Sequence, residues 1–435
     1  MLFKKDVKKM YKIALVYPEL YEIAKYKEKR KEFPPFGVLY IAAVIEKEHQ
    51  ITLFKIQKTT SIDFQNFDIV MFSIPSSATY NIIKTTRQYS IYNKETPIII
   101  GGLHPSYYPK QTLVDLNANI VVIGEGEDTI LEILNNIQKK ELIANINGIC
   151  FNNGSKIIIT PTRIHKRTLD NLPFPARHLL HKNEIIMSDR LSNTNITMSH
   201  IILSRGCPFS CKFCSVYNKQ VQHRSGHSVK KELIHLKSKY NINGFAIIDD
   251  NFIINKKNVL EICHEITDLN LSWSALSRID TINNELLKTM KKAGLIEVKY
   301  GIESGNNTLL QSMGKNINIK QISDVLKITK NNGILVKIFI IHGFPGENNK
   351  TTKDTINFLH ENKSLIDRVS LFRFVPLPGS YIFSNHQKYN IILSENWDDY
   401  HIYHNDKHWW GSRKDYKILQ ESYKAIKDFI DNTWS

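Results

Sequence analysis

The stretch HIILSRGCPFSCKFCSVY, residues 200–217, places three of the five cysteines of this 435-residue chain on one short segment after an apolar run. Cys207, Cys211 and Cys214 follow a CxxxCxxC spacing. Thiolates gathered on one loop suit either zinc or an iron–sulfur cluster. A structural zinc ion takes four ligands, and the nearest histidines, His223 and His227, do not stand at finger-like spacing. A four-iron cluster with three protein thiolates leaves one iron open, so we interpret the missing fourth cysteine as a functional feature.

The segment that contains and follows the cysteines alternates between strand-like and helix-like patterns. The strand-like runs are HIILS, GFAIIDD, LSWSALS, LIEVKYGIES, ILVKIFIIHG and RVSLFRFVP. Amphipathic stretches such as NVLEICHEITDL separate them. Six successive β/α units predict a partial TIM-type barrel over residues 198–385, in which functional groups gather on the loops at the carboxyl ends of the strands. The three cysteines lie on such a loop, after the first strand.

A second alternation precedes the cysteines. The runs KIALVY, ITLFKI, DIVMFSI, PIIIGG and NIVVIGEG are apolar on both faces and alternate with helical patterns. Strands of this kind form a parallel sheet that is covered on both sides, so residues 1–145 are predicted to form a doubly wound, Rossmann-like α/β domain. GICFNNGSKIIIT predicts a hairpin that turns at Asn153-Gly154. Residues 146–197 are therefore interpreted as hairpin and linker, and residues 386–435 as an aromatic-rich helical tail.

Composition and charge exclude several classes of protein. Five cysteines are too few for a disulfide scaffold. The apolar run near the N-terminus is broken by Pro18 and Glu19, so it does not match the long apolar region of a signal peptide. No stretch reaches the roughly 20 apolar residues of a membrane span. We therefore expect a soluble protein of the reducing cytoplasm, without a membrane partner. The net charge of +16 is dispersed apart from the run KEKRK at residues 27–31, so it does not favour a nucleic-acid partner.

The cysteine motif in its barrel context resembles the radical S-adenosylmethionine (radical SAM) enzymes. In that family three cysteines hold a 4Fe-4S cluster whose open iron binds S-adenosyl-L-methionine (SAM). The segments IIDDNFIIN, WSALSRID, YGIESG, HGFPGE and FVPLPGS resemble the loops after the second to the sixth strand. By this resemblance Phe213 would lie against the adenine of SAM. The residues implied to lie at or near the polar groups of SAM are Asp249, Asp250, Arg278, Glu303 and Ser304.

The segments PPFGVLYIAAVIE, GGLHPSYYP and VVIGEGEDT resemble the cobalamin-binding domain that precedes the barrel in one subclass of this family. Glycines at the carboxyl ends of parallel strands suit the ligand crevice of such sheets. The resemblance implies a pocket for the nucleotide tail of cobalamin that is lined by Ser73, Gly101, Gly102, Gly124, Gly126 and Thr129.

One feature of cobalamin mutases is missing from the chain. Their DxHxxG motif supplies a histidine to cobalt, but here QKTTSID follows ITLFKI, and His104 follows a different strand. We therefore expect cobalamin to bind without a histidine ligand to cobalt. The alternative is an α/β domain without a cofactor, because a fold alone does not establish a ligand.

The resemblance implies a cobalamin-dependent radical SAM enzyme, and we expect a methyltransferase that acts on an unactivated carbon of a small molecule or peptide. Such a reaction uses a 5'-deoxyadenosyl radical, methylcobalamin and an electron donor such as flavodoxin or ferredoxin. Cyclisation, rearrangement or another C–C or C–P bond-forming reaction is an alternative. A nucleic-acid-modifying enzyme of the methylthiotransferase type is a further alternative, but those enzymes carry a second cysteine triad in the N-terminal domain, where this chain has only Cys150. Cys150 and Cys263 are expected to be buried core residues.

The tail segment WDDYHIYHNDKHWWGS contains His401, His404 and His408 at a spacing that metal sites also show. No cysteine or carboxylate stands at a supporting spacing, so we interpret the segment as aromatic packing rather than as a second metal site. Trp409 and Trp410 are candidates for a lid over the substrate.

Overall fold

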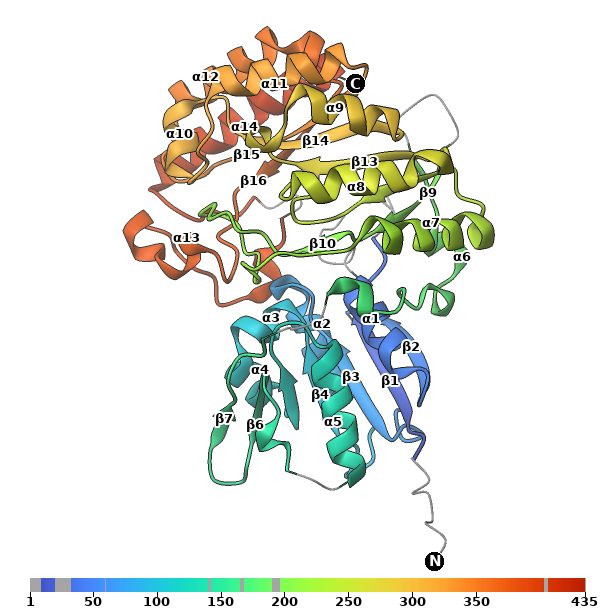
Figure 1. Ribbon diagram of the computed structural model, residues 1–435. Coiled ribbons are helices and arrows are strands. Elements are labelled where there is room, and N and C mark those ends of the chain that lie inside the picture. Colours follow the sequence, from blue (N-terminus) through green and yellow to red (C-terminus); the bar gives the residue numbers. More distant parts are fainter. Residues whose placement is uncertain are drawn as a thin grey trace, which may run out of the picture. The chain divides into compact units, whose positions relative to one another are not determined.

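The computed structural model describes residues 9–19, 33–58, 60–139, 142–164, 168–189, 196–402 and 406–434 (Figure 1). The chain divides into two compact units. Unit 1 comprises Met1–Arg167, Asn171–His181 and Asn396–Asp398. Unit 2 comprises Thr168–Asp170, Lys182–Glu395 and Asp399–Ser435. Unit 1 therefore includes a short segment that comes from far along the chain.

A seven-stranded sheet forms the centre of unit 1, in the order β2-β1-β3-β4-β5-β6-β7. Strands β1 to β5 pair in parallel, whereas β6 pairs antiparallel with both β5 and β7. The strands are β1 Lys12–Pro18, β2 Gln50–Ile56, β3 Ile69–Ser73, β4 Ile98–Gly101, β5 Ile120–Val122, β6 Ile149–Asn152 and β7 Ile157–Ile159. The predicted doubly wound parallel sheet is confirmed, and the predicted hairpin extends this sheet as β6 and β7.

Helices cover both faces of this sheet (Figure 1). Along β1, Ile13 and Leu15 face the core under α1 and α5, whereas Ala14 and Val16 face the core under α2. Both sides of the strand are buried, which is why its sequence is a continuous apolar run. The helices of unit 1 are α1 Phe36–Ile45, α2 Tyr80–Tyr89, α3 Leu103–Tyr107, α4 Pro109–Asp115 and α5 Glu127–Lys139.

Part of the segment expected to be a linker, Asn171–His181, is packed in unit 1. Ala176 belongs to the core under α1, and its N–H donates to Leu39 O at 3.1 Å. The guanidinium of Arg177 lies over the ring of Phe36, 5.3 Å from the ring centroid. This stretch is therefore held by single apolar residues that lie among prolines in the sequence, although it has no helical or strand periodicity.

A second seven-stranded sheet forms unit 2, in the order β16-β15-β14-β13-β12-β9-β8. Within this sheet all neighbouring strands pair in parallel except β8, which pairs antiparallel with β9. The strands are β8 Met187–Asp189, β9 Ile196–Ile201, β12 Gly244–Ile247, β13 Ser272–Ser277, β14 Leu295–Glu303, β15 Leu335–His342 and β16 Arg368–Arg373. The predicted partial barrel is confirmed as an open half-barrel. The short edge strand β8 was not expected, because its sequence Met-Ser-Asp has no strand pattern.

Helices α7 to α12 connect the strands of the half-barrel and cover its outer face (Figure 1). Helices α7 to α13 each begin at an Asn or Ser side chain that accepts a hydrogen bond from a backbone N–H of the first turn. These caps fix where each loop ends and each helix begins. The helices are α6 Lys182–Ile185, α7 Gly226–Tyr240, α8 Lys256–Ile266, α9 Asn284–Lys292, α10 Asn307–Ser312, α11 Ile319–Asn331, α12 Asn349–Glu361, α13 Tyr381–Ser384 and α14 Arg413–Trp434.

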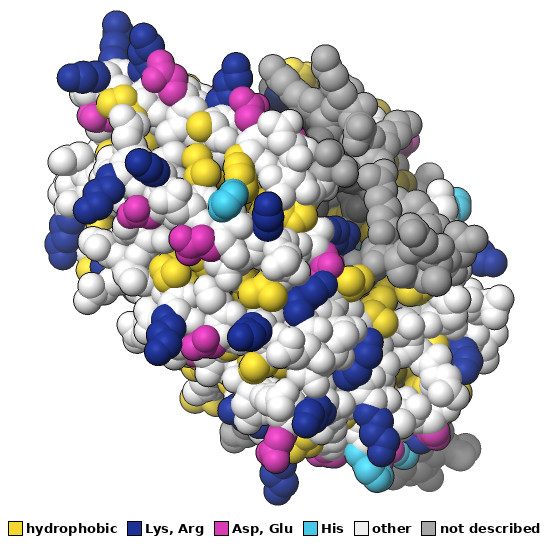
Figure 2. Space-filling model, turned by 90° about the horizontal axis from the view of Figure 1, so that it is seen from above, with side chains coloured by type: hydrophobic (Ala, Val, Ile, Leu, Met, Phe, Trp, Pro, Cys, Tyr) yellow, Lys and Arg dark blue, Asp and Glu magenta, His cyan; other side chains and the backbone are white. Residues whose placement is uncertain are grey.

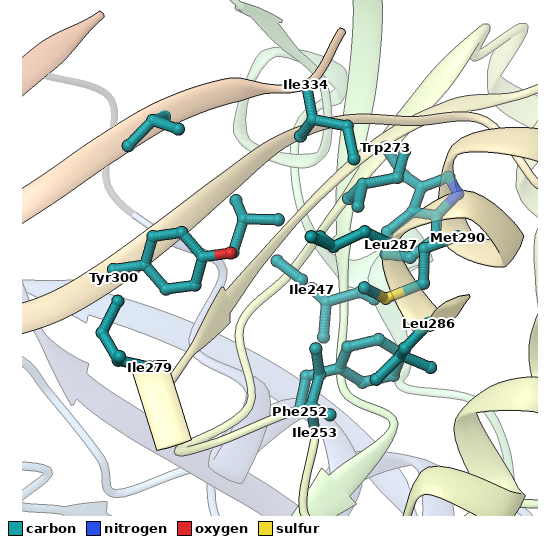
Figure 3. Packing of buried hydrophobic residues seen from close by; sticks show 14 of the residues in the cluster. Ile247, Phe252, Ile253, Trp273, Ile279, Leu286, Leu287, Met290, Tyr300 and Ile334 are labelled. Atoms are coloured by element: carbon teal, nitrogen blue, oxygen red, sulfur yellow. The ribbon is translucent and has the colours of Figure 1, made fainter. Parts of the chain in front are cut away.

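The main core of unit 2 lies between these strands and helices (Figure 3). Trp273 of β13 stacks on Phe245 of β12, with ring centroids 5.9 Å apart, and its Nε1 donates to Ala293 O at 2.8 Å. Figure 3 shows Leu287 and Met290 of α9 beside Trp273. Residues of β15 alternate between buried and half-buried, because one face meets the helices and the other lines the inside of the half-barrel.

The surface carries its excess positive charge in a dispersed form. Figure 2 shows Lys and Arg side chains spread over one face, with Asp and Glu among them. That face therefore has no concentrated basic patch. In the described residues, no helix has both the length and the apolar character needed to cross a bilayer.

Candidate functional site

The three cysteines lie on a loop that follows β9 and whose base is closed by a two-stranded ribbon, β10 Ser204–Arg205 and β11 Gln222–His223. Gly206 stands at this base with a φ of +90°. A Cβ on Gly206 would lie 2.4 Å from Gln220 O, so only glycine fits where the two backbones cross. The path of the chain is thus fixed immediately before Cys207.

The three thiols are half-buried and form no disulfide. Burial raises the pKa of Cys207 and raises the pKa of Cys214 to about 11, so both thiols are protonated until a metal displaces the proton. Within the described residues, no three His, Cys, Asp or Glu side chains converge on a point where one metal ion would sit. Three cysteines on one loop without a fourth suit a cluster with an open iron better than a structural zinc ion, which takes four ligands.

Arg278, which follows β13, supplies positive charge to this loop. Its Nη1 donates to Cys211 Sγ at 3.2 Å. Its Nε and Nη2 donate to the two carboxylate oxygens of Asp280 at 2.9 and 2.8 Å, and its guanidinium lies over the ring of Phe209, 3.8 Å from the centroid. A bidentate pair and a stacked ring hold the guanidinium in one orientation. Arg278, which the resemblance implied to contact SAM, therefore contacts Cys211, one of the predicted cluster ligands.

Asp249 and Asp250 follow β12 and support the cysteine loop. Asp249 is buried and accepts hydrogen bonds from Leu203 N–H at 2.7 Å and Ser204 Oγ at 2.6 Å, and burial raises its pKa to about 7. Asp250 accepts a hydrogen bond from Gly206 N–H at 3.3 Å. Both carboxylates therefore hold the backbone at the base of the loop, a role that the sequence did not indicate.

In unit 1, the residues predicted for cobalamin stand at the carboxyl ends of neighbouring strands. Ser73 ends β3 and Gly101 ends β4, and the two are register partners. Gly102 has a φ of +118°, and a Cβ there would lie 2.5 Å from Ile74 O. Gly101 and Gly102 therefore present backbone without side chains at the edge where open parallel sheets bind ligands.

The glycine-rich segment after β5 continues this edge. Gly124 N–H donates to Ser106 Oγ at 2.9 Å, and a Cβ on Gly126 would lie 3.1 Å from Ile41 Cδ1 of α1. Thr129 in the first turn of α5 is fully buried, and its Oγ1 has no hydrogen-bond partner among the described residues. Gly126 thus permits the close approach of α1, and the buried hydroxyl of Thr129 without a partner fits a polar ligand such as the nucleotide tail of cobalamin.

Comparisons with known proteins agree with both parts of this geometry. Residues 201–359 match the family model of the Radical SAM superfamily, and residues 28–134 match that of the B12 binding domain. An uncharacterized methyltransferase of Pyrococcus horikoshii is 30% identical over 406 residues, which cover 90% of this chain and 86% of the relative. The chain belongs to the cobalamin-dependent radical SAM enzymes.

Two further proteins are similar to this cobalamin-dependent radical SAM enzyme. An anaerobic magnesium-protoporphyrin IX monomethyl ester cyclase of Rubrivivax gelatinosus is 26% identical over 348 residues, which cover 75% of this chain and 61% of the cyclase. The solved structure of the radical SAM methyltransferase TsrM of Kitasatospora setae, with cobalamin and a 4Fe-4S cluster bound, has a TM-score of 0.66 and 16% identity over 89% of this chain and 76% of that one. At that identity the likeness shows a shared fold.

Glu303 and Ser304, at the end of β14, lie beside a buried lysine that the sequence did not single out. Lys315 Nζ donates to Glu303 Oε1 at 2.7 Å and also to Gly301 O. Both side chains are buried, and Glu303 has a left-handed φ of +68°, which is rare outside glycine. Ser304 Oγ accepts a hydrogen bond from Asn306 N–H at 3.1 Å. In this radical SAM domain Lys315 is therefore a further candidate for binding an anionic group, and only its burial distinguishes it from the many other lysines.

Asn251 is a second residue that the sequence analysis did not select. It follows Asp250, is 1% exposed, and neither its Oδ1 nor its Nδ2 has a hydrogen-bond partner in the described part of the chain. Buried amides almost always have partners, so an unpaired one next to the cysteine loop is a candidate ligand contact.

Phe213, between the last two cysteines, packs into an apolar cluster built around Phe344, Phe374 and Ile382, which Trp410 of the tail also joins. The backbone of the neighbouring Lys212 is bonded on both sides, since its N–H donates to Met313 O at 2.9 Å and its carbonyl accepts from Ile382 N–H at 3.0 Å. The cysteine loop is therefore locked against the carboxyl ends of β15 and β16.

His104 lies inside unit 1. It is fully buried, its Nδ1 lies 2.9 Å from Ser77 Oγ, and burial lowers its pKa to about 4. The rings of Tyr80, Tyr108 and Trp397 surround it, with centroids 4.7 to 5.2 Å from that of the imidazole. The enclosure of this imidazole by three rings supports the expectation that His104 does not ligate cobalt.

The remaining residues singled out in the sequence are buried in the core or contact other protein groups, where they are described. Cys150 and Cys263 are fully buried, as predicted. His404 lies outside the described residues, and His408 Nε2 lies 2.6 Å from Trp410 O. Trp410 Nε1 donates to Gly343 O at 2.7 Å, at the carboxyl end of β15.

Proposed function

We propose that this cobalamin-dependent radical SAM enzyme is a methyltransferase that acts on an unactivated carbon of a small molecule or peptide. The observation that carries the proposal is the cysteine loop itself, in which Cys207, Cys211 and Cys214 stand without a fourth thiol and Arg278 bonds to Cys211. The 30% identity to a methyltransferase along 90% of the chain supports this choice of reaction.

The residues of the chain have positioning roles in this function. When bound, the cluster and SAM supply a carbon radical, and cobalamin supplies a transferable methyl group. The three cysteines would hold the cluster, while Asp249, Asp250 and Gly206 fix the loop that carries them. Removal of a hydrogen atom needs a fixed distance between the substrate and the radical rather than an acid or base. A loop whose backbone is held by several hydrogen bonds agrees with this requirement.

Residues around the cysteine loop would bind SAM. Glu303, Ser304 and Lys315 offer a carboxylate, a hydroxyl and an ammonium within one buried cluster, and Asn251 offers a free amide. Phe213 supplies an apolar face for the adenine. In unit 1, the tail of cobalamin would lie against the glycines at the ends of β4 and β5 and bond to Thr129 Oγ1.

An electron donor such as flavodoxin or ferredoxin would reduce the cluster. We assign the reaction to the reducing cytoplasm, because all five cysteines are free and the three on the loop must stay reduced to bind iron.

Labelled SAM tests the reaction. With the methyl group of SAM labelled, the label should appear in the product. One SAM loses its methyl group and leaves as S-adenosylhomocysteine, and another leaves as methionine and 5'-deoxyadenosine, which carries the hydrogen atom of the substrate. The two nucleoside products should therefore form in about equal amounts.

Cyclisation is the second candidate, favoured by the 26% identity to a cyclase. It predicts 5'-deoxyadenosine without S-adenosylhomocysteine and without label in the product. That outcome would replace methyl transfer by cyclisation or rearrangement.

The cofactor assignments have tests of their own. After anaerobic reconstitution, the triple variant Cys207→Ala, Cys211→Ala, Cys214→Ala should lose its bound iron, whereas Cys150→Ala should keep it. Cobalamin bound to the protein should have the spectrum of a base-off form, and His104→Ala should leave that spectrum unchanged. Full iron in the triple variant, or no uptake of cobalamin, would contradict the respective assignment.

A further inference from the structure

A small cavity lies within unit 2 at the carboxyl ends of β15 and β16. Its volume is about 30 Å³, and it is lined by His342, Gly343, Arg373, Trp409, Trp410 and Gln420 among others. One water needs roughly 10–15 Å³ by this measure, so the cavity has room for a group of about two heavy atoms beyond its entrance. The residues of the tail segment and of α14 close it from one side.

The lining of this cavity is rich in hydrogen-bond donors and lacks acids. It includes Arg373, Lys407, His342 and His408 but no Asp or Glu. His342 is neutral, because burial lowers its pKa to about 3, and its Nε2 is engaged with Ser422 Oγ at 2.8 Å. The positive charge at the cavity therefore comes from the arginine and the lysine.

Arg373 is held in place by residues of α14. Its Nη2 donates to Gln420 Oε1 at 2.8 Å, and its guanidinium lies over the ring of Tyr423, 3.7 Å from the centroid. Asp406 acts on its charge without pairing with it, and no carboxylate of the described residues is within ion-pair distance. Burial lowers the pKa of Arg373. A half-buried guanidinium that contacts no carboxylate favours the binding of an anion.

Trp409 supplies a second donor without a partner. It is 4% exposed, and its Nε1 has no hydrogen-bond partner among the residues described. Trp410, by contrast, uses its Nε1 on Gly343 O, and Lys407 pairs with Asp399. The lining therefore offers a guanidinium without an ion pair and an indole N–H without a partner, and both suit a hydrogen-bond acceptor.

The cavity adjoins the wall that supports the cysteine loop. Phe374 and Trp410 line the cavity and also pack in the apolar cluster that holds Phe213. A group bound beside Arg373 would therefore contact residues that also pack against the cysteine loop.

We propose that this cavity binds a carboxylate carried by the substrate, with Arg373 as its ionic partner and Trp409 as its second donor. The assignment to the substrate rests on the proposed function, whereas the binding of a carboxylate does not. Planar, bidentate guanidinium recognition suits a carboxylate, whose two oxygens match the room beyond the entrance of the cavity.

Binding of acetate tests the site without any turnover. Thermal unfolding of the full chain would be followed in sodium acetate and in acetamide, the neutral analogue, at constant ionic strength. The midpoint for the wild type should rise and saturate with acetate only, because a ligand that binds the native state stabilises it. Arg373→Gln should abolish the rise. Trp409→Phe removes the indole N–H and should raise the half-saturating acetate concentration about tenfold, as expected for the loss of one hydrogen bond from a neutral donor to an anion.

The matched control is Arg413→Gln, at the exposed start of α14, which should respond to acetate as the wild type does. An equal acetate response in Arg373→Gln, or none in the wild type, would overturn the proposal. If Arg373→Gln does not fold, Trp409→Phe still decides, since an unchanged response would also overturn it.

A second arm separates a substrate carboxylate from a free anion. Small acids, each paired with its primary amide, would be screened by the same measurement. The proposal is supported by acids that stabilise the protein at concentrations well below the acetate concentration needed. These acids should lose this advantage in Arg373→Gln, and their amides should not stabilise the protein. If no acid binds more tightly than acetate, the cavity holds a free anion and the assignment to substrate is wrong. Failure of the labelled-SAM experiment with acids still bound would affect the proposed reaction alone.

Discussion

Asn251 shows how one buried side chain can reveal a binding site. A buried amide without partners destabilises the native state by about 1–3 kcal/mol, so a residue of this kind is explained best by a ligand that completes its hydrogen bonds. Its neighbours Asp249 and Asp250 are engaged with the backbone of the cysteine loop, which leaves Asn251 as the free polar group after β12.

Replacement of Asn251 by leucine, which has a similar shape, tests this role. Asn251→Leu should raise the free energy of unfolding of the protein without cofactors by about 1 kcal/mol, because it removes unpaired polar atoms. It should weaken SAM binding to the reconstituted protein at least tenfold. Chemical denaturation and calorimetric titration with SAM measure the two effects. Asn258→Leu, which loses a bond to Arg224 O, should do the reverse, losing stability and keeping SAM affinity. Unchanged SAM affinity in Asn251→Leu would rule out the contact.

Glu347 is a buried carboxyl group whose ionisation should be visible in the stability of the protein. It accepts a hydrogen bond from Thr351 Oγ1 at 2.6 Å and from Gly343 N–H at 3.4 Å, yet burial raises its pKa from 4.5 to about 7. The native state then holds a proton that the unfolded state releases. The contribution of Glu347 to the free energy of unfolding is therefore greatest below pH 4.5, and it is lost as the pH rises through about 7.

We expect the free energy of unfolding of the wild type to fall, relative to that of Glu347→Gln, by up to about 3 kcal/mol between pH 4.5 and 7.5, at 1.36 kcal/mol per pKa unit. Denaturant titrations of both proteins across this range measure the difference, in which the other titrating groups cancel. Parallel pH profiles for the two proteins would show that Glu347 is ionised in the native state throughout.

At the scale of elements, the inner face of the half-barrel is held by an ion pair that crosses a strand. Glu297 of β14 has a fully buried side chain and accepts a hydrogen bond from Arg368 Nε of β16 at 3.0 Å, so the pair spans β15. Lys299 Nζ lies 3.8 Å from the same carboxylate. Loss of one partner would leave a buried charge uncompensated.

Arg368→Met should lower the free energy of unfolding by about 3 kcal/mol, because Glu297 then lacks its main counter-charge. The double variant Glu297→Gln, Arg368→Met should recover most of this loss. Lys330→Met breaks the more exposed pair with Asp367 and should lower stability by less than about 1 kcal/mol. Denaturant unfolding compares the variants. A double variant as unstable as the single one would show that packing of the Arg368 side chain, not the charge, stabilises the strands.

At the scale of the whole molecule, the two units are interleaved along the chain. Asn396–Asp398 belongs to unit 1 although the residues on both sides belong to unit 2. Trp397 completes the ring cluster around His104, and Asn81 Nδ2 donates to Asp398 Oδ1 at 2.9 Å. The tail therefore contributes to the stability of the first domain.

Trp397→Ala should lower the stability of unit 1 by about 2 kcal/mol, since it removes a half-buried aromatic side chain. Amide exchange should then quicken in β3 and β4 and stay unchanged in β12 and β13. Trp434→Ala, which loses contacts of α14 and a bond to Ile366 O, should have the opposite pattern. Equal acceleration in both units after Trp397→Ala would show that they unfold as one.

The sequence by itself determined the main strands of both sheets, apart from β8, together with the class of both sheets and the place of the cysteine loop. These follow from local patterns: apolar runs define buried parallel strands, and CxxxCxxC on one loop predicts a set of thiol ligands. Asn and Ser before the helices fixed their starts for the same local reason.

Only the tertiary structure decided which polar residues are already engaged and which are free to bind. Asp249, which the resemblance implied to lie near SAM, bonds to the backbone of the cysteine loop, and Lys315 pairs with Glu303. Asn251, by contrast, has no partner among the described residues. These differences arise because burial removes water and leaves each group with the partners that distant segments bring. Trp397 and Arg373 are further cases, since one packs against residues some 300 positions earlier in the chain and the other meets Gln420 and Trp409 only after α14 has folded back onto the sheet. Such contacts depend on the path of the whole chain, which no local pattern encodes.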